Sequence, residues 1–151
     1  MTAVVALLIA LDPIGIGLRW RRRWQAALAV VVALALALAT VVASPVLDAL
    51  DLSPEGFWIA AGIVLLVPAF SRLLSGTTTD VAGPAAPLVA MALATRDGRT
   101  STLVGAVVAG AATYAASRLP EGRWTAIAER IVGALMVVIA FDLVRDGVIA
   151  V

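Results

Sequence analysis

Two long apolar runs limit what this chain can fold into more than any other feature. Ala26–Ala43 and Thr100–Ser117 are each 18 residues long and contain no charged residue. A helix needs about 20 predominantly apolar residues to cross the hydrocarbon core of a bilayer, and these runs meet the lower limit. They lack the alternation of a membrane strand, so they predict membrane helices rather than a barrel.

The overall composition agrees with a membrane protein and excludes several enzymes. The 151 residues are 62% hydrophobic with a mean hydropathy of +1.06, well above the roughly 50% apolar content of a soluble domain. Every basic residue is arginine, and histidine and cysteine are absent. Zinc peptidases, Ser–His proteases and thiol carriers are therefore excluded. We expect no enzyme, no cofactor and no metal centre of this kind.

Six candidate spans follow one another along the chain. The first is expected to remain as a membrane span and not to be cleaved as a signal peptide, because its arginines follow the apolar stretch rather than precede it. The spans are Thr2–Leu18, Gln25–Ala43, Gly56–Leu74, Thr77–Ala94, Thr100–Ser117 and Thr125–Val144. The connections Ser44–Glu55 and Arg118–Arg123 contain proline and charged residues and are expected to face water.

Arginine placement predicts a multi-pass protein of the inner (plasma) membrane with both termini outside, because arginine-rich short loops stay in the cytoplasm. In this orientation the inner connections hold Arg19, Arg21, Arg22, Arg23, Arg72, Arg118 and Arg123, and the outer ones hold Arg96, Arg99 and Arg145. The preference of arginine for cytoplasmic loops accounts for the Arg19–Arg23 cluster. We therefore expect no nucleic-acid partner.

An offset of 71 residues relates the two halves of the chain. It superposes Pro13 on Pro84, Gly62 on Gly133, Phe70 on Phe141 and Gly76 on Gly147. These matches predict one transmembrane domain made of two units, about 1–74 and about 75–151. Because each unit has three spans, the second must be inverted. The expected fold is all-α: a six-helix membrane bundle built from two inverted three-helix repeats, with Phe70 and Phe141 in corresponding environments.

Two of the spans contain a proline where a continuous helix is expected. Asp12-Pro13 lies in the first span and Gly83-Pro84 in the fourth, so both helices are expected to be interrupted there. In hydrocarbon, freed backbone groups are tolerated only where protein or a cavity satisfies them. The alternative is that Asp12 only caps the half-helix that starts at Pro13. Thr78 and Thr79, just before the second break, are either ligands or part of a polar turn.

Two motifs resemble those of the MarC family of six-helix bacterial membrane proteins. They are A-L-D-P-I-G in the first span and V-A-G-P-A-A in the fourth. In addition, the closing segment from Arg130 to Gly147 is similar to that family's last helix. Related families belong to the lysine-exporter superfamily. The resemblance covers essentially the full chain and implies a secondary transporter, with neutral amino acids among the solutes associated with the family.

The predicted function is transport of a small polar solute through a midplane site formed by Asp12, Pro13, Gly15, Thr78, Thr79, Gly83 and Pro84. One alternative is a cation transporter with an oxygen-only site for Na⁺ or a divalent metal. Another is a membrane scaffold that transports nothing. The expected partners are the solute or ion and membrane lipid, and the small enclosed volume favours a homodimer. Asp142 is expected to pair with Arg145 rather than to belong to the site, and Asp80 is a weaker candidate than Thr79.

Overall fold

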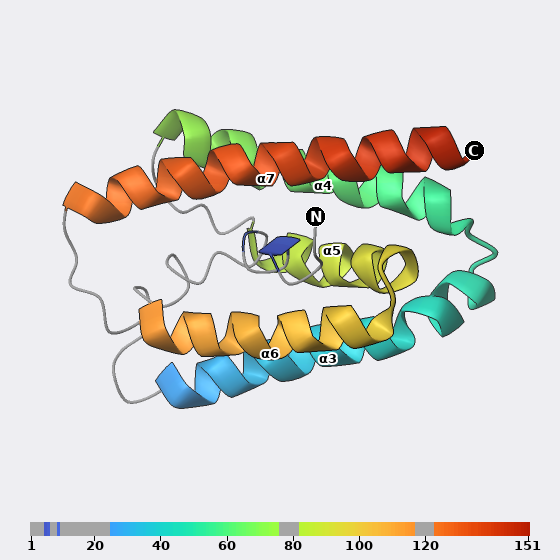
Figure 1. Cartoon of the computed structure of the whole chain (residues 1–151), viewed down its shortest axis with the longest axis horizontal. Coiled ribbons are helices and arrows are strands. Elements are labelled where there is room, and N and C mark those ends of the chain that lie inside the picture. The colour runs from blue at the N-terminus through green and yellow to red at the C-terminus, as the bar shows by residue number, and fades with distance from the viewer. Residues whose placement is uncertain (1–4, 7–8, 10–24, 76–81, 117–122) are drawn as a thin grey trace.

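The computed structural model describes residues 5, 6, 9, 25–75, 82–116 and 123–151. Five α-helices lie in the longer described segments (Figure 1). They are α3 (Gln25–Ala49), α4 (Pro54–Ser75), α5 (Ala82–Arg96), α6 (Arg99–Ala116) and α7 (Arg123–Ala150).

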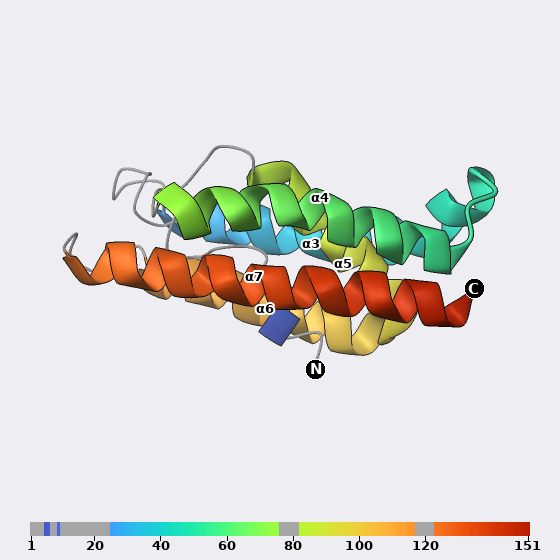
Figure 2. The same cartoon turned by 90° about the horizontal axis from the view of Figure 1, so that it is seen from above.

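The helices form two layers with one helix between them. Helices α4 and α7 run antiparallel in one layer, α3 and α6 run antiparallel in the other, and α5 lies between the two (Figures 1 and 2). The core is built from small and branched apolar side chains of all five helices, among them Leu36, Leu65, Val89, Leu93, Ala106 and Met136. Because α5 is surrounded by the other helices, it contributes more core residues for its length than they do.

Two tight turns hold consecutive helices together at one end of the bundle. Between α3 and α4, Asp51 has a positive φ of 53°, and the Leu52 N–H donates to the Leu47 carbonyl at 3.0 Å. Ser53 then caps α4 by accepting the Gly56 N–H at 3.2 Å, and Pro54 occupies the first helical position, where no donor is needed. Between α5 and α6, Gly98 has a φ of 95°, which glycine adopts without strain.

Glycine allows the close approach of α4 and α7. A Cβ placed on Gly62 would lie 2.7 Å from the carbonyl oxygen of Ala140, and one on Gly133 would lie 3.1 Å from that of Ala69. These contacts are reciprocal, since Gly62 and Gly133, like Ala69 and Ala140, are 71 residues apart. Close backbone contact at small residues is typical of helix pairs in membranes.

Two of the described helices are long and apolar enough to cross a membrane. The apolar stretches are Ala29–Ala49 of α3 and Pro54–Leu74 of α4, and only 28% and 33% of their most apolar windows are buried inside the protein. A core helix of a soluble protein would be mostly buried. Instead, large apolar side chains of α3 are more than half exposed, among them Val30, Val31, Leu34 and Leu38.

The prediction of a six-helix membrane bundle made of two inverted three-helix repeats is wrong. The described part of the chain contains five helices, and two of these are candidate spans. Helix α5 has 15 residues, too few for a bilayer-spanning helix. Helix α6 opens on a polar turn, and the apolar run of α7 is interrupted by charged side chains, namely Arg130, Asp142, Arg145 and Asp146.

Several predicted boundaries also change. Helix α3 continues through Pro45 to Ala49, so Ser44–Ala49 is helical rather than part of a water-facing loop. The fourth candidate span was expected to be interrupted at Gly83-Pro84, but α5 begins at Ala82 and both residues lie in its first turn. Proline is favoured there because the first amides of a helix have no partner within it. The span Thr2–Leu18 lies almost entirely outside the described residues.

Candidate functional site

The residues predicted to form the midplane site fall mostly in segments that the structure does not describe. Asp12, Pro13, Gly15, Thr78 and Thr79 lie outside the described residues, as does Asp80. Gly83 and Pro84 are in the first turn of α5. The structure therefore places the backbone of one predicted break, and it does not test whether the two breaks lie close together.

Helix α5 is short and buried, and it begins inside the bundle. Its 15 residues correspond to a length of about 22 Å, compared with about 30 Å for a bilayer core. In both views it starts near the middle of the long axis and ends at the end that carries the C-terminus (Figures 1 and 2). Its side chains Val89, Ala90, Ala92 and Leu93 have no exposed surface. The residues that follow Gly83 and Pro84 are buried as well, since Ala85 and Ala86 are 1% and 4% exposed.

The opposite end of α5 carries a compact group of charges. Arg96 donates from Nη1 to Oδ2 of Asp142 and to Oδ2 of Asp146, both at 3.1 Å, and its Nε donates to Oδ1 of Asp97 at 2.8 Å. Asp142 and Asp146 are four residues apart on α7 and so lie on the same face of that helix. We call Arg96, Asp97, Asp142 and Asp146 the Arg96 cluster.

The Arg96 cluster is partly shielded from water. The side chain of Arg96 is 11% exposed, and those of Asp97, Asp142 and Asp146 are 22%, 33% and 38% exposed. One guanidinium contacts three carboxylates here, and because arginine keeps its charge in proteins it neutralises part of their negative charge. Since the protein's own cation occupies the centre, the cluster is not a vacant cation site. Among the described residues, no group of acidic side chains is arranged to hold a metal ion.

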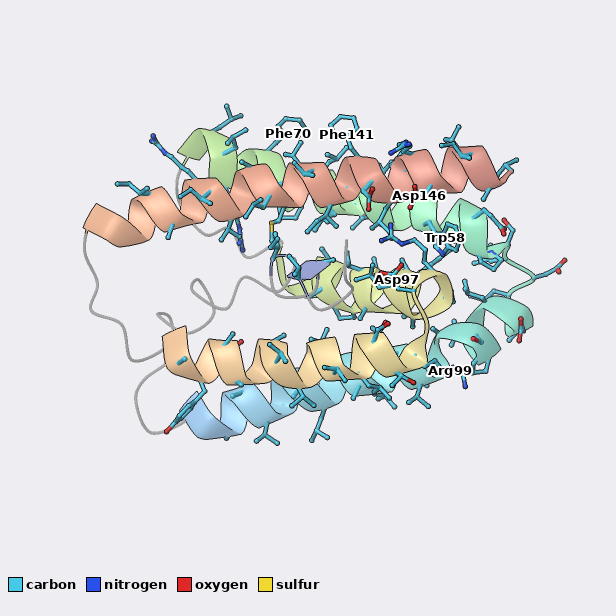
Figure 3. All side chains as sticks on the ribbon, in the orientation of Figure 1. Trp58, Phe70, Asp97, Arg99, Phe141 and Asp146 are labelled. Carbon is cyan, nitrogen blue, oxygen red and sulfur yellow. The ribbon has the colours of Figure 1, made fainter. Side chains whose placement is uncertain are left out.

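A second polar contact joins the same end of α5 to α4. Trp58 donates from its indole Nε1 to Oγ1 of Thr95 at 2.9 Å, and the Thr95 hydroxyl also lies 2.9 Å from the carbonyl of Ala92. Trp58, Asp97 and Asp146 are gathered at this end of the bundle (Figure 3). The last two residues of α5 are thus bonded to both helices of the α4–α7 layer.

The expected pairing of Asp142 with Arg145 is wrong. Asp142 pairs with Arg96, which lies 46 residues earlier in the chain, and Arg145 is exposed. The sequence pattern places Arg96 only in a connecting loop and does not reveal the cluster. The spacing of Asp142 and Asp146, two acids on one helical face at the end of an apolar run, was the signal that could have suggested a shared cation.

Arg72 is a further residue whose position differs from its sequence-based interpretation. The arginine distribution places it among the cytoplasmic connecting residues, but it lies in the last turn of α4 and is 1% exposed. It follows Leu65 and Ala69 along the buried face of that helix, and its Cβ approaches Gly133 of α7. A charged side chain that faces the interior of an apolar bundle marks a functional position more often than a structural one.

An apolar groove of about 380 Å³ lies between α3 and α6, in the half of the bundle away from the Arg96 cluster. Its lining is almost entirely aliphatic: Ala29, Val30, Ala33, Val107, Gly110, Ala111 and Tyr114. A groove of this composition offers few hydrogen-bonding partners for a polar solute. The buried polar side chains of α3 and α6, Thr40, Thr102 and Thr113, bond to backbone carbonyls four residues earlier and do not line a polar site with this groove.

In comparisons with known proteins, no family model, no curated protein and no solved structure matches the chain.

Proposed function

We propose that this protein is a secondary membrane transporter of a small polar solute, with neutral amino acids as the first candidates. The observation that carries this proposal is α5, a short buried helix that begins near the middle of an apolar bundle. The first amides of a helix have no partner within it and form the positive end of the helix dipole. At that depth they need a polar partner, and a solute can provide one.

Helices of this kind occur in transporters, where half-helix ends near the midplane bind substrate groups. In the sequence, Thr78 and Thr79 precede α5 by a few residues and add hydroxyls that suit the same role. The similarity of the A-L-D-P-I-G and V-A-G-P-A-A motifs to the MarC family supports the same function. In this proposal Asp12, Pro13 and Gly15 complete the site, the protein sits in the inner membrane among lipid, and a homodimer is the expected assembly.

The proposed orientation places the connection between α3 and α4 outside. It rests on the arginine count of the connections, seven on the inner side against three on the outer side, Arg96, Arg99 and Arg145. Since basic residues favour the cytoplasmic side, the arginine-rich end is expected to be cytoplasmic. A reporter active only outside the cytoplasm should be active when inserted between α3 and α4, the two candidate spans, and inactive when inserted directly after Ser75. The reverse pattern would contradict the orientation.

Uptake into proteoliposomes tests the function. The purified protein should accumulate one or more members of a panel of amino acids when an ion gradient is imposed, and a parallel panel of cations tests the alternative. Asp12→Asn keeps the size and capping ability of the side chain but removes its charge. If Asp12 binds a coupling ion or a substrate ammonium, Asp12→Asn should lower uptake at least tenfold while the protein still inserts. Asp48→Asn, at an exposed position, is the matched control.

Normal uptake by a well-inserted Asp12→Asn protein would remove Asp12 from the site. In that case Asp12→Ala should still lower the folded yield, as expected for a helix cap. Absence of uptake for every solute and cation, with protein that is correctly inserted, would count against transport itself and favour the scaffold alternative.

A further inference from the structure

The described polar side-chain bonds between α5 and other helices lie at the C-terminal end of α5. Within the described part of the chain, the polar bonds from α5 to other helices come from Thr95, which binds Trp58 of α4, and from Arg96, which binds α7. The rest of the buried surface of α5 is formed mostly by alanine, including Ala85, Ala86 and Ala90. Within the α4–α7 layer, α5 packs mainly on α4, and the ion pairs of Arg96 are its described polar bonds to α7.

The Arg96 cluster is closed in this structure, and a second arrangement results if the end of α5 moves away from α7. With α5 in place, one guanidinium bridges Asp142 and Asp146 at 3.1 Å each. If the end of α5 moves away, Arg96 and Asp97 leave together, and two carboxylates four residues apart on α7 lose their shared cation. Like charges at this spacing repel each other. The contact is therefore either closed with its charges paired or open with its carboxylates in water.

The position of the cluster makes it a barrier to water. Thr95 and Arg96 directly follow Leu93 and Ala94, which are 0% and 6% exposed. The buried side chains that the structure describes are mostly apolar, and the buried hydroxyls of Thr40, Thr102 and Thr113 bond to carbonyls four residues earlier in the chain. Asp97 and Asp146 of the cluster lie toward the end of the bundle with the C-terminus, so the cluster stands between that end and the start of α5 (Figure 3).

We propose that the Arg96–Asp142–Asp146 ion pairs form the outer gate of the solute path, closed in this structure and opened when the end of α5 separates from α7. This inference rests on the proposed transport function. It assigns to Arg96, Asp142 and Asp146 a role in access to the site, distinct from binding the solute.

Cysteine accessibility tests the gate directly, because the chain contains no cysteine and a single one can be introduced without background. Ala90→Cys places a thiol at a buried position, six residues and about 9 Å along the helix from Arg96. The protein is reconstituted in liposomes with the outer face accessible, and the rate of reaction with a membrane-impermeant maleimide is measured. Asp142→Asn/Asp146→Asn removes the partners of Arg96 on α7 and leaves Asp97 to compensate its charge.

We expect the thiol at position 90 to react at least tenfold faster in the double variant than in the parent. Asp142→Asn alone keeps the ion pair between Arg96 and Asp146, so it should give an intermediate rate. Arg145→Gln, between the two aspartates on α7 but exposed, should leave the rate unchanged. A second reporter, Ala69→Cys in the buried half of α4 away from the cluster, should not respond. If the double variant does not fold, the single variant provides the test.

An unchanged labelling rate at position 90 in a folded variant would overturn the gate. An equal increase at positions 69 and 90 would also overturn it, since that result indicates general loosening. The labelling experiment needs no solute, so it tests the gate independently of the uptake experiment that tests the transport function. Uptake with unchanged labelling rejects the gate alone, whereas faster labelling at position 90 without uptake of any solute supports the gate and rejects the proposed function.

Discussion

Arg96→Gln is expected to lower the free energy of unfolding by about 2–3 kcal/mol. The substitution removes the cation shared by Asp142 and Asp146 and leaves three carboxylates close together without compensation. Loss of one partner from a fully buried ion pair costs roughly 3–5 kcal/mol. The expected value is lower here because the carboxylates are 22–38% exposed and water screens part of their repulsion. Unfolding of the purified protein in mixed micelles measures the change.

Arg99→Gln is the matched control for this experiment. Arg99 begins α6 three residues after Arg96, is exposed, and lies at the same end of the bundle (Figure 3). A positive charge at a helix N-terminus is mildly unfavourable, so its removal should leave stability unchanged or raise it slightly. Equal effects of the two substitutions would contradict a specific role for the Arg96 cluster.

Gly62→Leu is expected to destabilise the protein by about 3 kcal/mol, because α4 and α7 are too close at this point to accept a side chain. The first added carbon alone would lie 2.7 Å from the Ala140 carbonyl oxygen and 2.7 Å from Cγ2 of Val144. The carbonyl belongs to a helix backbone, so relief requires the helices to separate and to lose contacts along the whole crossing. The thermal midpoint in detergent and the yield of monodisperse protein both report the effect.

Gly56→Leu provides the comparison on the same helix. A carbon added to Gly56 would meet only the flexible hydroxyl of Ser53, at 3.0 Å, and the position is exposed. Leucine favours helix over glycine by about 0.8–1 kcal/mol, so this variant should be neutral or more stable. A destabilised Gly56→Leu together with a stable Gly62→Leu would show that packing of α4 on α7 does not depend on the glycine.

Local sequence patterns predicted the positions of most helices in the described part of the chain. The span expected at Gly56–Leu74 is α4, Pro54–Ser75, and the one expected at Thr100–Ser117 is α6, Arg99–Ala116. These predictions succeed because apolar length, caps and prolines act within one segment of chain. The pattern shared by the third and sixth spans also identified Gly62 and Gly133, which meet the opposite helix where α4 and α7 cross.

Local sequence patterns could not predict how many helices span the membrane or how deep each helix lies in the bundle. Apolar runs were counted as spans, although α5 is short enough to begin inside the bundle and α7 carries charges that another helix compensates. An apolar segment has the same composition whether lipid or protein surrounds it. Only its neighbours in space distinguish a span from a buried half-length helix.

The sequence alone determined where most of the described helices form and that Gly62 and Gly133 occupy equivalent positions 71 residues apart. Only the tertiary structure decided that Arg96 bridges Asp142 and Asp146, 46 and 50 residues away, and that Arg72 is buried. The physical reason is that these features depend on the register and crossing of separate helices. That register results from the packing of the whole core, and no single segment specifies it.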